Sequence, residues 1–125
     1  MNQVHDVYES MVVAVARVGR EVSGVDRALR EAIHPVAHAI PWIEAGVEPA
    51  LTRFAAHEAY LSVIGIGQCL LDAQDAGHSD VAPAMRAVNA VLDAFEPHVV
   101  AADRKVRHVL LDGLPVSAAL RRLAG

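Results

Sequence analysis

The chain has 125 residues, the length of one domain, and it is long enough to build a hydrophobic core without disulfide bonds or a structural metal. Its net charge of -4 comes from acidic and basic residues that are interspersed, and no basic stripe of the kind that binds nucleic acid is present. We therefore predict a single helical-bundle domain over residues 1–125 with no nucleic-acid partner.

Cys69 is the single cysteine, which excludes an internal disulfide bond. The N-terminal residues carry neither the basic start nor the apolar core of a signal peptide. The longest strongly apolar run, residues 59–71, is too short to cross a bilayer, which takes about 20 residues. We expect a cytoplasmic protein that has no membrane partner.

The first predicted helix covers residues 3–33. Its apolar residues alternate at spacings of four and three from Val4 to Ala32, which is typical of a helix that packs along one seam in a bundle. A glycine weakens a helix by about 1 kcal/mol relative to alanine, so we expect a slight bend near Gly24. Because the residue before a proline avoids the helical region, Pro35 ends this helix.

The connection that follows, residues 35–47, contains two X-Pro steps and the only tryptophan, Trp42. We predict a turn or two of helix here that caps one end of the bundle. A connection of this length carries function more often than a tight turn does.

The central helix is predicted over residues 49–75, with Glu48 and Pro49 as its cap and first helical residue. A helix in a bundle needs one apolar stripe along its length, and this helix is apolar on additional sides. One narrow face consists of small residues apart from Glu58, and small side chains let another helix come close. The face is made by Ala55, Glu58, Ser62, Gly65 and Cys69.

A third helix is predicted over residues 81–112, because the four-three alternation of apolar residues continues through Pro97. We favour one helix with a kink at this proline. The alternative is a break, with Glu96 as a cap and Pro97 as a new start. A short C-terminal helix is predicted over residues 115–124, and a helix of this length has to dock on the bundle to be stable.

These elements predict an all-α fold, an antiparallel bundle of three long helices in up-down-up order with the C-terminal helix as a fourth element. The central helix is apolar on more faces than such a bundle covers. We therefore expect a second copy of the chain to bury the surplus, which makes the protein a homodimer.

Seven histidines make the chain histidine-rich, and histidine is a common metal ligand. In the predicted arrangement several of them share one half of the bundle with carboxylates, beneath the 34–48 connection. The candidate ligand-binding residues are Glu58, His57, His34, His38, His108 and Trp42. A metal ion or haem, if bound, would use His34, His38, His57, Glu58, Asp103 and His108; we predict no cofactor.

Glu58 is the sharpest single candidate because it is the one charged residue on the face of small residues. If it is buried, its carboxylate needs a partner such as Arg104 or His108. If the face opens at this position, Glu58 is simply hydrated. Both interpretations remain open at the level of the sequence.

The chain contains no nucleophile elbow, no glycine-rich phosphate loop and no Cys-x-x-Cys pair, so we do not expect an enzyme. The leading hypothesis is a homo-oligomeric binding or protein-interaction module. The alternative is a bundle that binds a small molecule, a metal or haem at the His/Glu site and is enzymatic through Glu58. A third hypothesis is a regulatory domain that docks on a protein partner through Val12, Val13 and the C-terminal helix.

Overall fold

The computed structural model of the protein describes residues 3–46, 48–78 and 80–112, and every regular element in these ranges is helical. The all-α class is therefore confirmed. A short 3-10 segment, η1 (Glu96–His98), and a π-helical turn, η2 (His108–Asp112), flank the last helix. The α-helices are α1 (Gln3–Gly19), α2 (Ser23–Ala45), α3 (Pro49–Asp75), α4 (Ala82–Phe95) and α5 (Ala101–Arg107).

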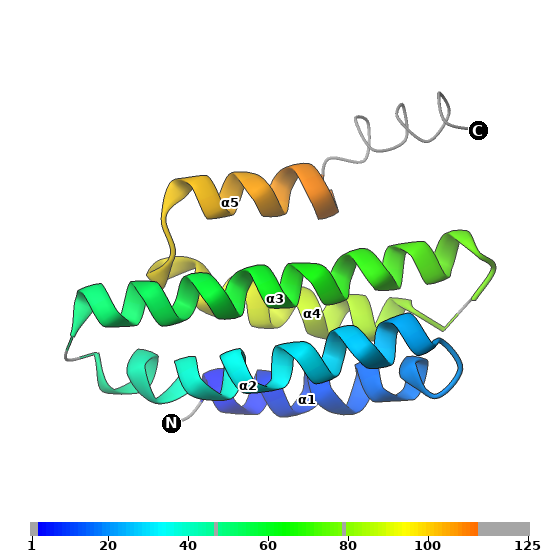
Figure 1. The fold of residues 1–125 in the computed structure, drawn as a ribbon, viewed down its shortest axis with the longest axis horizontal. Helices are drawn as coiled ribbons and strands as arrows, with labels where there is room; N and C mark the ends of the chain where they lie inside the picture. The colour runs from blue at the N-terminus through cyan, green and yellow to red at the C-terminus, as the bar shows by residue number, and fades with distance from the viewer. Residues whose placement is uncertain (1–2, 47, 79, 113–125) are drawn as a thin grey trace.

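The helices α1 to α4 form an antiparallel bundle in up-down-up-down order (Figure 1). Each packs on two others: α1 on α2 and α4, and α3 on α2 and α4, with the most extensive contact between α2 and α3. Short connections between long helices favour this arrangement. Helix α5 runs along α3 on the side away from α2 (Figure 1), and η2 also contacts α3.

The prediction of one helix over residues 3–33 is wrong, because the chain turns back between α1 and α2. The N–H of Val22 donates to the carbonyl of Val18 at 3.0 Å inside this turn. The two helices come so close that a Cβ added to Gly19 would lie 3.1 Å from Cα of Asp26. The close approach requires a glycine at this position, and it converts the expected bend into a helix end.

The predicted connection over residues 35–47 is also wrong, because α2 continues through Pro35 and Pro41 and ends at Ala45. A proline inside a helix costs about 3 kcal/mol. Four buried apolar residues offset this cost, since a buried valine or isoleucine is worth about 1.5–3 kcal/mol and a buried alanine less. They are Val36, Ala39, Ile40 and Ile43. The helix ends at Gly46, whose φ of 64° is left-handed, as is common after a helix C-terminus.

At Pro97 the structure shows a break, so the favoured kinked helix over residues 81–112 is wrong. The alternative is confirmed as to the break but wrong as to the new start, because Glu96 and Pro97 lie in η1 and the next helix begins at Ala101. Helix α4 ends at Phe95, and extended residues Val99 and Val100 lead into α5. The predicted apolar seam holds at Val99, which is buried, but it is wrong after that residue, because Val106 and Val109 are exposed. The side of α5 and η2 that faces the bundle carries Asp103, Arg107 and Leu111. The predicted C-terminal helix over residues 115–124 lies outside the described residues.

Helix α3 has the bounds predicted for it, residues 49–75, and it is the central helix of the bundle. Its buried side chains include Tyr60, Ile64 and Leu70, which are among the largest fully buried ones. By length and hydropathy alone α3 would also suit a membrane span, but half of that window is buried inside the bundle. This burial is what the central helix of a helical bundle requires.

Candidate functional site

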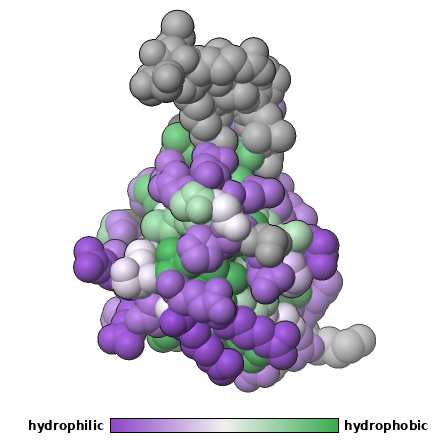
Figure 2. All heavy atoms as spheres, turned by 90° about the vertical axis from the view of Figure 1, so that its right-hand side faces the viewer, coloured by the Kyte–Doolittle hydropathy of each residue, from purple (hydrophilic) through white to green (hydrophobic). Residues whose placement is uncertain are grey.

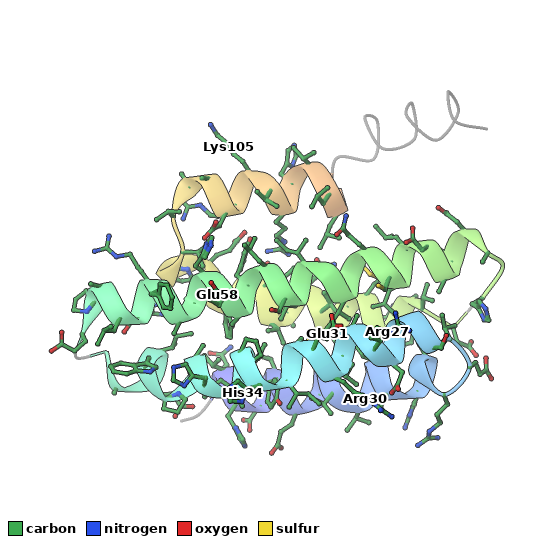
Figure 3. The ribbon with its side chains drawn as sticks, in the orientation of Figure 1. Arg27, Arg30, Glu31, His34, Glu58 and Lys105 are labelled. Carbon is green, nitrogen blue, oxygen red and sulfur yellow. The ribbon has the colours of Figure 1, made fainter. Side chains whose placement is uncertain are left out.

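The two histidines predicted on the connection lie on the outside of α2. His34 and His38 are exposed, and their rings stack on each other with centroids 6.4 Å apart. Figure 3 shows His34 on the face of α2 that points away from the core. Residues 34–45 belong to α2, so the predicted connection that was to cover the site is a helix.

Trp42 is half-buried in the last turns of α2, where it serves the helix end. Its carbonyl oxygen accepts hydrogen bonds from the Gly46 N–H at 3.0 Å and from the Thr52 hydroxyl at 3.4 Å. These bonds fix the connection between α2 and α3. The Trp42 side chain itself is partly buried and packs against the hydrophobic core.

Glu58 is exposed on α3, so the hydrated interpretation holds and the buried one is wrong (Figure 3). Neither proposed partner contacts its carboxylate. The guanidinium of Arg104 donates instead to the Val99 carbonyl at 2.9 Å, and His108 is exposed on η2. Glu58 therefore belongs to a surface and not to a buried polar site.

His57 and Asp103 are the one pair of predicted metal ligands that the structure joins by a hydrogen bond. His57 Nδ1 lies 2.8 Å from Asp103 Oδ2. The imidazole is 43% exposed, whereas Asp103 is buried with only 4% of its surface accessible. Among the described residues no three histidine, cysteine, aspartate or glutamate side chains lie close enough to hold a metal ion. The pair connects α5 to α3.

A second polar cluster holds α5 on α4 and was not predicted from the sequence. Arg107 is buried, and one nitrogen, Nη1, donates to Asp93 at 2.8 Å and to Glu96 at 3.0 Å. Its Nη2 donates to Asn89 at 3.0 Å. Burial lowers the pKa of Arg107, but the hydrogen bond and charge of Asp93 and the charge of Glu96 outweigh it and raise the pKa. The arginine therefore stays charged inside the cluster.

Tyr60 completes this cluster from α3. It is fully buried, and its hydroxyl donates to Glu96 Oε1 at 3.3 Å. Burial and the neighbouring charge of Glu96 raise the pKa of Tyr60 to about 12, although Arg107 opposes the shift. A usable signal existed in the sequence, since Asn89, Asp93 and Glu96 are spaced by four and three on one helix face.

Large hydrophobic side chains that remain exposed gather on two neighbouring segments. Of the nine such residues in the described part of the chain, seven belong to α3 or to residues 100–110. We define the outer face of α3 as a row at spacings of four and three that is exposed throughout except at the half-buried Gly65. The row contains Phe54, Glu58, Leu61, Gly65, Gln68 and Asp72. Phe54 is 67% exposed and Leu61 37%, so this face presents apolar surface to its surroundings.

A groove of about 500 Å³ follows the same face where α3 meets α2. Its floor is made of small residues, among them Ala28, Ala32 and Gly65, and its rim carries Glu31 and Asp72. Cys69 also lines the groove. Burial raises the pKa of the Cys69 thiol, and the carboxylates of Asp72 and Glu31 raise it further, which leaves the thiol unreactive near neutral pH.

A second cavity, of about 510 Å³, lies at the end of the bundle where α1 turns into α2 and α3 leads to α4. Its lining includes Arg17, Glu21, His78 and Asp80, together with Val18 and Val81. Figure 2 views this end, where hydrophilic side chains surround smaller hydrophobic areas. It contains none of the candidate site residues.

No family model, no curated protein and no solved structure matches the chain. The described side chains alone therefore carry the functional inference. They form polar clusters that hold α5 in place, and they leave apolar side chains exposed on the outer face of α3 and along residues 100–110.

Proposed function

We propose that the chain is a homo-oligomeric helical-bundle module whose role is to bind protein, with no chemistry of its own, and that its first partner is a second copy of itself. The observation that carries this proposal is the outer face of α3, where Phe54 is 67% exposed on the most deeply embedded helix of the bundle. Soluble monomers rarely leave a contiguous apolar patch open, and such patches mark interaction sites.

The polar clusters support a binding role over an enzymatic one. His57 bonds to Asp103 and Arg107 bonds to Asp93, so both contacts join α5 to the bundle. Of the remaining candidate ligands, His34 and His38 are exposed together on α2, and His108 is exposed on η2. A binding module needs a rigid scaffold with one open face, and the described contacts supply both.

Light scattering on the purified full chain at micromolar concentration tests the proposal. The monomer mass is 13.3 kDa, and we expect a mass close to twice that value. A monomer mass at every concentration would contradict the proposal. Elemental analysis and a visible spectrum are the second arm, because bound metal or haem near one equivalent would favour the His/Glu site instead.

A further inference from the structure

The outer face of α3 has two unlike halves. Its N-terminal half is a ridge, formed by Leu51 and Phe54, which are 49% and 67% exposed. Its C-terminal half is the groove of about 500 Å³, whose floor includes Gly65 and the two alanines of α2. When two copies pack antiparallel through this face, the ridge of each copy lies opposite the groove of the other.

Gly65 is a glycine that the single chain does not need. A Cβ added at this position would meet nothing within 4 Å, and the residue lies in the interior of a helix. Glycine there costs about 1 kcal/mol relative to alanine. A glycine in a regular element is useful where another backbone or side chain approaches closely. The open space above Gly65 is therefore where an incoming side chain fits.

Charge repulsion disfavours a parallel pair. The groove rim carries the carboxylates of Glu31 and Asp72, whereas Arg53 lies on the other flank of α3 beside Pro97 and His98. Figure 3 shows Glu31 on the side of α2 next to α3, and Glu58 further toward the other end of the face. A parallel pair would set Glu31 and Asp72 against their own copies and leave both grooves unfilled. An antiparallel pair with its axis near Leu61 moves each of these carboxylates far along the helix from its own copy.

We propose that two copies pair antiparallel through the outer faces of α3, with the two-fold axis at Leu61 and the Phe54 ring of each copy in the groove of the other. This inference deepens the proposed function and rests on it. The two Leu61 side chains meet at the axis. Phe54 precedes the axis by seven residues, and the turn from Gly65 to Gln68 follows it by four to seven. Isologous contact of one self-complementary patch is the usual form of a dimer.

The antiparallel arrangement places residues 61 and 54 differently relative to their own copies in the partner. In the antiparallel pair the two copies of residue 61 face each other, whereas the two copies of residue 54 are separated by 14 residues of rise, about 21 Å. In a parallel pair each position would face its own copy. A disulfide bond forms only when the Cα atoms are within about 7 Å, so cysteine crosslinking distinguishes the two arrangements.

The test uses the full chain with Cys69→Ala as background, carrying either Leu61→Cys or Phe54→Cys as a matched pair. Both sites are exposed, so each substitution is compatible with the fold, and circular dichroism checks this. After mild oxidation we expect Leu61→Cys to form the crosslinked dimer at least about tenfold more than Phe54→Cys, because only the former satisfies disulfide geometry. Light scattering on the reduced proteins records the mass separately.

Crosslinking of Phe54→Cys as readily as Leu61→Cys would overturn the antiparallel arrangement and leave the proposed function standing. Absence of both crosslinks in a protein of dimer mass would do the same and place the dimer contact on another face. Monomer mass throughout would overturn both proposals. A monomer that loses heat stability on Phe54→Glu would assign the face to another part of the same chain and also overturn the inference.

Discussion

Helix α3 is covered by α5 along one flank and open along its outer face, and the two sides use their glycines differently. Gly67 lies under η2, where an added Cβ would come within 2.9 Å of Leu111 Cδ2. Gly65, two residues earlier, has nothing within 4 Å of that point. On the covered flank, the glycine therefore makes room for a contact within the chain, the packing of Leu111 against α3. The open face keeps a small residue that no internal contact explains.

The two sides also differ in polar content. The covered flank is held by His57 with Asp103, and by Arg107 with its partners on α4. The outer face carries Phe54 and Leu61 without a covering element in the described part of the chain. Hydrogen bonds and ion pairs fix α5 in one position on the bundle. An apolar surface without such directional contacts is suited to binding a separate partner chain.

The largest change in stability is expected from removing Arg107. In the Arg107→Met variant Asp93 and Glu96 lose their shared donor, and Glu96 keeps only the hydrogen bond from the Tyr60 hydroxyl. Because those carboxylates are partly exposed, we expect a loss of about 2–3 kcal/mol rather than the full cost of an isolated buried charge. Urea unfolding measures the loss. Stability equal to wild type would show that the cluster does not hold α5.

The His57→Ala variant should cost less, about 1–2 kcal/mol, because it leaves the buried carboxylate of Asp103 without its histidine partner. The control is Glu58→Ala, one residue along on the outer face, which should stay within about 0.5 kcal/mol of wild type. Urea unfolding of both variants gives the comparison. If the two variants behave alike, the covered flank and the outer face do not differ as described.

The two glycines give the sharpest matched pair. Gly65→Ala should raise the free energy of unfolding of the separated chains by up to about 1 kcal/mol, because it only improves the helix. Gly67→Ala gains the same amount but crowds Leu111, and crowding costs about 1–3 kcal/mol, so we expect a net loss of about 1 kcal/mol. Denaturant unfolding at submicromolar protein measures both. A gain for Gly67→Ala as large as for Gly65→Ala would refute the assignment of the two roles.

The smallest effect at neutral pH is expected for Tyr60→Phe, within about 1 kcal/mol. Above neutrality it becomes informative, because the pKa of Tyr60 is raised from 10.0 to about 12 in the folded chain. Between pH 10 and 12 the unfolded chain loses this proton before the folded chain does, so the stability of the wild type falls as the pH rises. Unfolding curves across this window should show a weaker fall for Tyr60→Phe. Equal slopes would mean that Tyr60 titrates as an exposed tyrosine.

The sequence predicted the all-α class and the bounds of α3, because long apolar periodicity is a strong signal. It failed at the ends of the other helices for identifiable physical reasons. The seam of α1 and α2 continues across the turn at Gly19, so periodicity alone does not show that the chain reverses. Pro35 and Pro41 stay in a helix because the burial around them outweighs their local cost. At Pro97, in contrast, the helix is broken, and the chain turns so that α5 packs on α3.

The candidate site was predicted only in fragments. The pairing of His57 with Asp103 depends on where α5 docks, and no spacing along the chain encodes that position. After Pro97, valines were predicted to be the buried residues of the helix. Instead Asp103 and Arg107 are buried, because each has a charged or polar partner. The surplus of apolar surface on α3 was predicted, and Phe54 and Leu61 are where it lies. Its use as a homodimer contact stays a prediction.

The central claim is that the open face of α3, and no other exposed apolar position, joins two copies. Sedimentation equilibrium of Phe54→Glu tests it against Val13→Glu, a matched change at a residue on α1 that is 58% exposed. We predict that Val13→Glu keeps the dimer mass of the wild type, whereas Phe54→Glu sediments as a monomer at the same concentration. A Phe54→Glu variant that keeps the wild-type dimer, or a Val13→Glu variant that dissociates equally, would contradict the account.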